Sequence, residues 1–145
     1  MPLERVDKER LARISDFLQE ELKDFRDKFL KVDYKSYKAD SDLRRNIERC
    51  IENIVNASLD IAKIILVSEE IAVPETYREY FLSLTARDII DETNAPMLAN
   101  GVRMRNILAH QYLDIRWQKI EGFITTDWKA YETFLNSIKK YLSKK

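Results

Sequence analysis

The sequence of 145 residues contains one cysteine, one histidine, two glycines and three prolines, and these shortages exclude several classes of protein. A single thiol, Cys50, cannot close an internal disulfide, so the fold has to form without covalent cross-links, as in a reducing cytoplasm. One histidine without a spaced set of cysteines leaves no ligand pattern for a zinc site. No apolar run approaches the roughly 18 to 20 residues that a membrane span needs, and residues 3–22 carry too much charge for a signal peptide. We therefore expect a cytoplasmic protein that needs no metal or cofactor and does not associate with a membrane.

A net charge of one sign is also lacking, because 25 acidic residues balance 25 basic ones. The whole-molecule field therefore offers nucleic acid no general attraction, so any RNA binding has to be local and DNA is not expected as a partner. No glycine-rich phosphate loop or serine nucleophile elbow occurs either. A small acidic cluster, Asp88, Asp91 and Glu92, could bind a metal, but an exposed helix end is the favoured interpretation.

What the sequence does contain is an apolar pattern with a period near 3.6, which recurs in almost every segment and indicates an all-α fold. The length is that of one domain, residues 1–145. We predict a small antiparallel bundle of about five helices, in which helices over residues 7–30 and 41–68 pair as a hairpin. Asp40 or Ser41 should cap the second helix, and Cys50 should pack in the core.

The remaining three helices are predicted from residues that favour helix starts and breaks. Pro74 suits the first turn of a third helix that carries Tyr77 and Tyr80. Asn94 and Pro96 should open a fourth helix that runs to about residue 113. After a break at residues 121–122, a threonine at 125 or 126 should cap a last helix that reaches residue 142.

The residues that indicate chemistry lie in the predicted fourth helix, in the run Arg105-Asn106-Ile107-Leu108-Ala109-His110-Gln111-Tyr112. RNA cleavage needs a base for the 2′-OH proton, an acid for the leaving oxygen and a cation for the phosphorane charge. An imidazole can be the base or the acid near neutral pH, and an arginine can clamp phosphate through two N–H bonds. On an ideal helix, Arg105 and Tyr112 lie about 20° apart, but Arg105 and His110 lie about 140° apart. They could converge on one phosphate if the helix loosens near His110 or if a second subunit completes the site.

Each of these residues alone is more often structural, as a hydrogen-bonded histidine, a solvated arginine or a core aromatic. Their combination, Arg, four residues, His, one residue, Tyr, with Asn after the Arg, resembles the signature of the HepT-like branch of the HEPN superfamily. Similar runs are Arg45-Asn46-Ile47-Glu48-Arg49, Pro74-Glu75-Thr76-Tyr77-Arg78-Glu79 and Tyr112-Leu113-Asp114-Ile115. The resemblance extends over about residues 6–142. One departure is Ala109, where a larger aliphatic residue often stands.

This resemblance implies a metal-independent endoribonuclease that is the toxin of a type II toxin–antitoxin module. Its antitoxin would be a nucleotidyltransferase of the MNT type, which transfers AMP from ATP to the motif tyrosine. Arg105 and His110 would then be catalytic, Asn106 would support the site, and Tyr112 would be the AMPylation acceptor.

Two questions stay open at this stage. Because each chain has one histidine, a two-fold homodimer would supply both the acid and the base in one cleft. Arg103 and Arg116 could enlarge the positive patch around that cleft and contact RNA, or they could be solvated surface charges. The alternative function is a helical module that docks beside a nucleotidyltransferase and helps to hold its nucleotide or substrate without hydrolysing RNA.

Overall fold

A computed structural model describes residues 3–144 of the chain, and within that range the fold is entirely helical. The all-α prediction is therefore confirmed. The described part contains seven α-helices and one π-helical turn, so the expected five helices left out the short α2 and α6. The elements are α1 (Arg5–Lys28), α2 (Tyr34–Ala39), α3 (Ser41–Ser68), α4 (Arg78–Thr85), α5 (Ala95–His110), α6 (Leu113–Gly122), η1 (Phe123–Asp127) and α7 (Trp128–Ser143).

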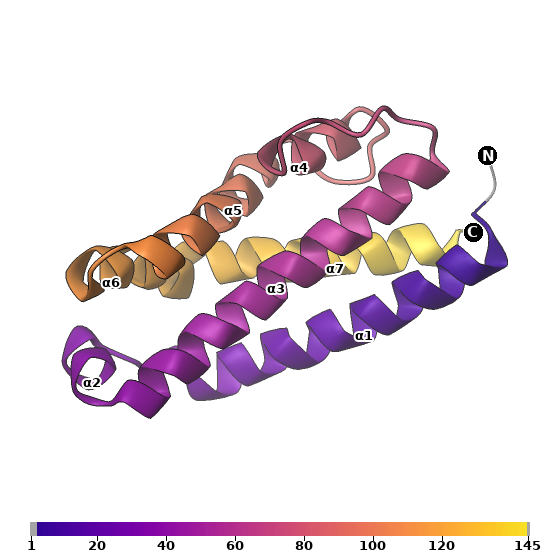
Figure 1. The fold of residues 1–145 in the computed structure, drawn as a ribbon. Helices are drawn as coiled ribbons and strands as arrows, with labels where there is room; N and C mark the ends of the chain where they lie inside the picture. The colour runs from indigo at the N-terminus through magenta and orange to yellow at the C-terminus, as the bar shows by residue number, and fades with distance from the viewer. Residues whose placement is uncertain (1–2, 145) are drawn as a thin grey trace.

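The two longest helices, α1 and α3, form the predicted antiparallel hairpin and lie side by side along the molecule (Figure 1). Helix α3 has the predicted bounds, and it begins at Ser41 because the Asp40 side chain accepts hydrogen bonds from the backbone N–H groups of Asp42 and Leu43. These bonds satisfy donors that have no partner within the helix. Cys50 is buried on the face of α3 toward α1, where its thiol donates to the Glu21 carbonyl oxygen, as expected for a core cysteine.

The third helix begins later than predicted, at Arg78 rather than at Pro74. Residues between Ile71 and Tyr77 leave mostly exposed side chains and offer no apolar face that packing could hold against the core. Helix formation needs such tertiary support in a short segment, because the first turn is costly to nucleate. Tyr80, by contrast, is buried on the inner face of α4.

The C-terminal half differs most from the prediction. Helix α5 ends at His110, and a separate helix, α6, starts at Leu113. No break follows at residues 121–122, because Gly122 has helical dihedral angles and the chain continues through the π-helical turn into α7. Thr125 does not cap a helix but donates its hydroxyl to the Glu121 carbonyl.

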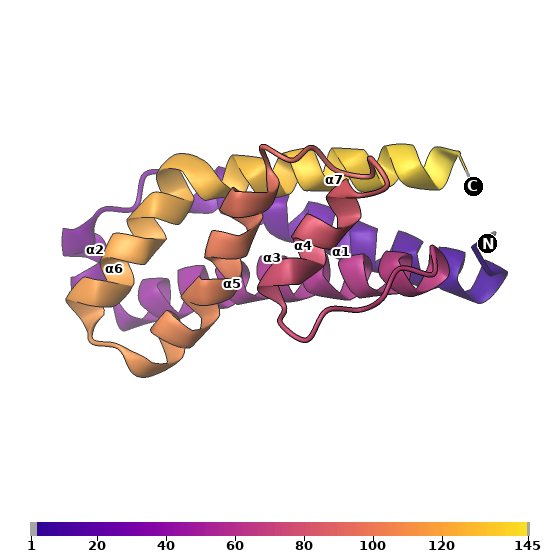
Figure 2. The ribbon, with the colours of Figure 1, turned by 90° about the horizontal axis from the view of Figure 1, so that it is seen from above.

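Helix α5 packs across the bundle and is joined to α7 by a buried contact (Figure 2). The fully buried hydroxyl of Tyr131 donates to the Leu98 carbonyl oxygen at 2.7 Å. Gly101 lies one turn further along α5, and the absence of a side chain there leaves space for the Tyr131 ring. Asn94 does not cap α5 with its side chain, which instead donates to the Ala130 carbonyl at 2.9 Å. These contacts fix the position of the helix that carries the motif.

Candidate functional site

The motif lies at the C-terminal end of α5, where the chain turns sharply into α6 at the end of the bundle away from both termini (Figure 2). His110 is the last residue of α5. Gln111 and Tyr112 follow with extended backbone, at ψ values of 163° and 164°. The helix therefore ends within the motif, but it stays regular through His110, because the backbone N–H of Gln111 still donates to the Ile107 carbonyl at 3.0 Å. The loosening that could bring Arg105 and His110 together within one chain is not seen, so a second subunit would have to complete the site.

Arg105 reaches from α5 toward two other helices. Its Nη1 donates to Oδ1 of Asn56 on α3 at 2.5 Å, and its guanidinium carbon lies 5.2 Å from the centroid of the Tyr77 ring, just before α4. Stacking on an aromatic face and one hydrogen bond together hold the orientation of the guanidinium group. The side chain is only partly buried, so its remaining N–H donors can still bind an anion. The sequence did not indicate Asn56 or Tyr77 as neighbours of Arg105.

The other motif side chains are exposed. The His110 imidazole forms no hydrogen bond within residues 3–144, and Tyr112 is 81% exposed. Asn106 and Arg103 also lie on the solvent side of α5. Within one chain, the structure therefore places His110 and Tyr112 two residues apart at an open corner, while Arg105 is fixed separately against α3.

One geometric expectation about Tyr112 is wrong. An uninterrupted helix would return it to the face of Arg105, but the helix stops at His110 and Tyr112 lies in the extended linker before α6. The exposed position of Tyr112 follows from this linker and not from helical periodicity.

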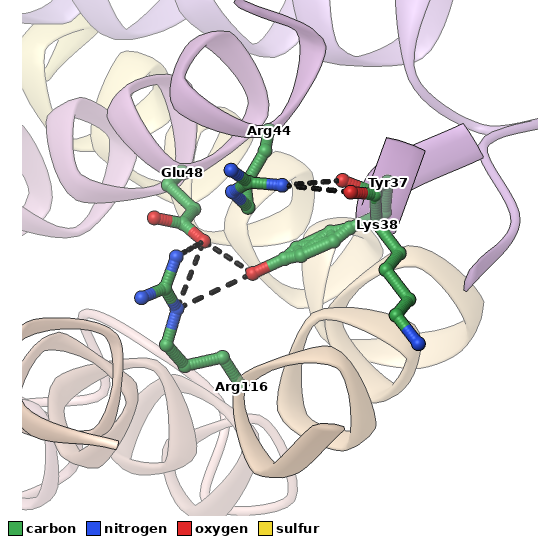
Figure 3. Close-up of polar contacts among 5 residues, drawn as sticks. All are labelled: Tyr37, Lys38, Arg44, Glu48 and Arg116. Carbon is green, nitrogen blue, oxygen red and sulfur yellow. Dashed lines mark hydrogen bonds and ion pairs between the residues drawn. The ribbon is translucent and has the colours of Figure 1, made fainter. Parts of the chain in front are cut away.

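Arg116 is not a solvated surface charge. Its Nη2 lies 2.7 Å from Oε2 of Glu48 on α3, and its Nε donates to the Tyr37 hydroxyl at 3.3 Å (Figure 3). Tyr37 also donates to Glu48, and burial together with that hydrogen bond raises the pKa of Tyr37 to about 12. Trp117 packs against Tyr37 with ring centroids 5.3 Å apart. This cluster joins the start of α6 to α2 and α3, so the guanidinium of Arg116 supports the bend that carries the motif and is already paired.

Asp127, in the π-helical turn, should make the stability of the fold depend on pH. It is 8% exposed, no hydrogen bond to its carboxylate forms within the described residues, and burial raises its pKa to about 6. The native state therefore takes up this proton at a higher pH than the unfolded chain, in which an aspartate titrates near 3.9. Its contribution to stability is full below about pH 4 and is lost as the pH rises through about 6.

We expect Asp127→Asn to raise the free energy of unfolding by about 1 to 3 kcal/mol at pH 7 and to have little effect at pH 4. Urea unfolding of both proteins between pH 4 and 8 measures the difference. Asp16→Asn, at an exposed position of α1, is the control and should show no such pH dependence. An equal effect of Asp127→Asn at pH 4 and at pH 8 would contradict a raised pKa of Asp127 in the folded protein.

Two other kinds of feature are absent from residues 3–144. No three histidine, cysteine, aspartate or glutamate side chains in this range come together in an arrangement that could hold a metal ion. No helix in this part of the chain is long and apolar enough to cross a membrane.

Comparisons with known proteins agree with the architecture. Residues 9–138 match the sequence family described as Ribonuclease HepT-like. A protein named mRNA nuclease HepT, from Shewanella oneidensis, is 27% identical over 94 residues, which are 65% of this chain and 68% of that protein. The fold is similar to that of a tri-AMPylated Shewanella oneidensis HEPN toxin in complex with an MNT antitoxin, with a TM-score of 0.78 at 20% identity over 90% of this chain and 96% of that one. A toxin–antitoxin structure with AMP-PNP gives a TM-score of 0.78 at 19% identity over 90% and 97% of the two chains.

Proposed function

Since the chain belongs to the HepT-like ribonuclease family, we propose that it is the ribonuclease toxin of a toxin–antitoxin pair and that it cleaves RNA internally in the cytoplasm. The observation that carries this proposal is the arrangement of the motif on α5, where the single histidine of the chain is exposed at the end of the helix and Arg105, five residues earlier, has a fixed orientation. Names of similar proteins, an mRNA nuclease and a HEPN toxin bound to an MNT antitoxin, support the same assignment.

In the proposed reaction, the 2′-oxygen of a ribose attacks the adjacent phosphorus and the 5′-oxygen of the next nucleotide leaves. One imidazole takes the 2′-OH proton and another donates a proton to the leaving oxygen. Arg105 binds the non-bridging oxygens through the N–H donors that Asn56 does not use. Asn106 and Arg103 are both exposed on α5. Asn106 supports the site, and Arg103 is available to contact the RNA backbone.

Two imidazoles require two chains, because each chain has one histidine. We therefore propose a two-fold homodimer in which the ends of both α5 helices face one cleft. Light scattering should give the mass of two chains. A strictly monomeric protein that still cleaves RNA would contradict this arrangement.

The test of the proposed activity is incubation of the purified protein with mixed RNA in the presence of EDTA. We expect cleavage by the wild type and a strong loss for His110→Ala, since no step in the scheme uses a metal. Abolition of cleavage by EDTA with recovery in magnesium would contradict metal independence. A folded wild type that binds a nucleotidyltransferase but cleaves no RNA under either condition would favour the non-catalytic docking module.

Regulation is proposed to act at Tyr112, whose hydroxyl is freely accessible. The phenol oxygen would attack the α-phosphate of ATP, held by the nucleotidyltransferase, and pyrophosphate would leave. Each AMP adds a bulky group and negative charge two residues from His110, where it would block RNA and repel its phosphates.

We expect the nucleotidyltransferase, ATP and magnesium to add mass to the wild type in steps of one AMP and to abolish cleavage without unfolding the protein. Tyr112→Phe should escape both effects while it retains much of its cleavage activity. Tyr77→Phe, at another exposed tyrosine, is the matched control and should be labelled like the wild type. Equal labelling and silencing of Tyr112→Phe would place the acceptor elsewhere.

A further inference from the structure

A groove between α1 and α3 lies beside the proposed phosphate-binding arginine and has no role in the reaction described above. It has a volume of about 240 Å³ and is lined on α1 by Arg13 and Phe17 and on α3 by Asn53, Asn56 and Asp60. The two helices that form it are neighbours along their length (Figure 1). Sites for drug-sized ligands occupy roughly 300 to 1,000 Å³, so this groove suits a smaller, flat group.

The lining of the groove carries an exposed ring together with unpaired polar groups. Phe17 is 46% exposed although it is a large aromatic side chain. Within residues 3–144, the side chains of Arg13, Asn53 and Asp60 form no hydrogen bond or ion pair, and Asn56 uses only its oxygen, toward Arg105. The groove thus offers a stacking surface, amide donors and acceptors, a carboxylate and a cation. Unpaired RNA bases are recognised by this combination of stacking and hydrogen bonds to their edges.

Asn56 connects the groove to the site of cleavage. It lines the groove, and its Oδ1 accepts the hydrogen bond from Nη1 of Arg105 at 2.5 Å. A phosphate bound by Arg105 is therefore one side chain away from the groove, which places the groove within reach of a nucleotide next to the scissile bond.

We propose that the groove is a base-recognition subsite, in which one unpaired RNA base stacks on Phe17 while Asn53 and the free amide nitrogen of Asn56 read its edge. Asp60 accepts hydrogen bonds from an exocyclic amino group, and Arg13 pairs with a neighbouring phosphate. This inference rests on the proposed ribonuclease function and adds to it a source of sequence preference near the cut.

The test maps the cut positions of wild type and variants on a random-sequence, single-stranded RNA library. We expect the wild type to prefer certain bases at one position flanking the cut. Phe17→Ala should lose that preference and lower kcat/KM about 5- to 150-fold, the range that follows from removing a stacking partner. Asn53→Ala should lose the same preference, because it removes a hydrogen-bonding partner of the base edge. Leu82→Ala, at an exposed apolar residue of α4, and Asn46→Ala, two turns before Asn53 on α3, are matched controls that should keep both.

Three results would overturn the subsite. The first is a wild type that cleaves RNA with no base preference at any flanking position, and the second is a pair of groove variants with unchanged preference and rate. The third is conversion of the dimer into monomers by Phe17→Ala, seen by light scattering, because the groove would then be covered by a second copy of the chain. A wild type that cleaves no RNA would instead refute the proposed function itself.

Discussion

Alanine at Arg105 or at His110 should lower the rate of RNA cleavage about 10²- to 10⁴-fold, the range for the loss of a charge stabiliser or of a general acid–base group. The fold should survive both changes. His110 is exposed and forms no hydrogen bond within the described residues, and Arg105→Ala removes one hydrogen bond to Asn56 at a partly exposed position. Single-turnover cleavage of a labelled RNA measures the rate, and circular dichroism checks the fold.

Arg103→Ala provides the matched control, because it removes the same charge two residues earlier on α5. Arg103 is exposed and has no partner comparable to Asn56 within the described residues, so we expect a loss of no more than about tenfold, as for a contact to the RNA backbone. Equal losses for Arg103→Ala and Arg105→Ala would mean that local charge, and not the fixed orientation of Arg105, drives the reaction.

The largest effect on stability is expected for Gly101→Ala. A Cβ at this position would overlap the Tyr131 hydroxyl oxygen and would lie 2.9 Å from Cζ of the same ring. The ring is fully buried and packs against Phe123 and Phe81, so it has little room to move. The substitution should overpack the core and disturb the hydrogen bond to Leu98, at a cost of about 2 to 5 kcal/mol in the free energy of unfolding.

Denaturant unfolding of Gly101→Ala and Gly122→Ala separates this close contact from the helix propensity of glycine. Gly122 has helical dihedral angles, and a Cβ added there would meet no atom of the described residues within 4 Å, so alanine should stabilise the protein by up to about 1 kcal/mol. Adding Tyr131→Phe to Gly101→Ala should recover part of the loss, because the hydroxyl oxygen is the nearest atom. Wild-type stability of Gly101→Ala alone would show that Tyr131 can move at little cost.

The sequence by itself predicted the features that depend on neighbours along the chain. The bounds of α3 follow from an apolar stripe and from Asp40, whose capping bonds reach only two and three residues ahead. Two elements that we did not predict also had local signals. A capping pair, Asp33 and Ser36, opens α2, and the spacing of Leu113, Trp117 and Ile120 indicates α6.

The motif shows where local information ends. Its residue types and their spacing could be read from the sequence, and they led to the family that the comparisons support. The end of α5 at His110 could not be predicted from the sequence, because the two residues that follow, Gln111 and Tyr112, are neither glycine nor proline and so do not mark a turn. Residues outside the motif hold that turn, since Arg116 hydrogen-bonds to Tyr37 and Glu48. Trp117 packs against the Tyr37 ring.

Tertiary structure alone decided which side chains meet the functional residues. Arg105 binds Asn56, which is 49 positions away, and Arg116 binds Glu48 at a separation of 68. Periodicity tells which face of a helix is apolar, but not which face of another helix it meets or at what height. Those contacts depend on how all the helices pack together, and for that reason the orientation of Arg105, the proposed catalytic arginine, and the groove beside it became visible only in the folded chain.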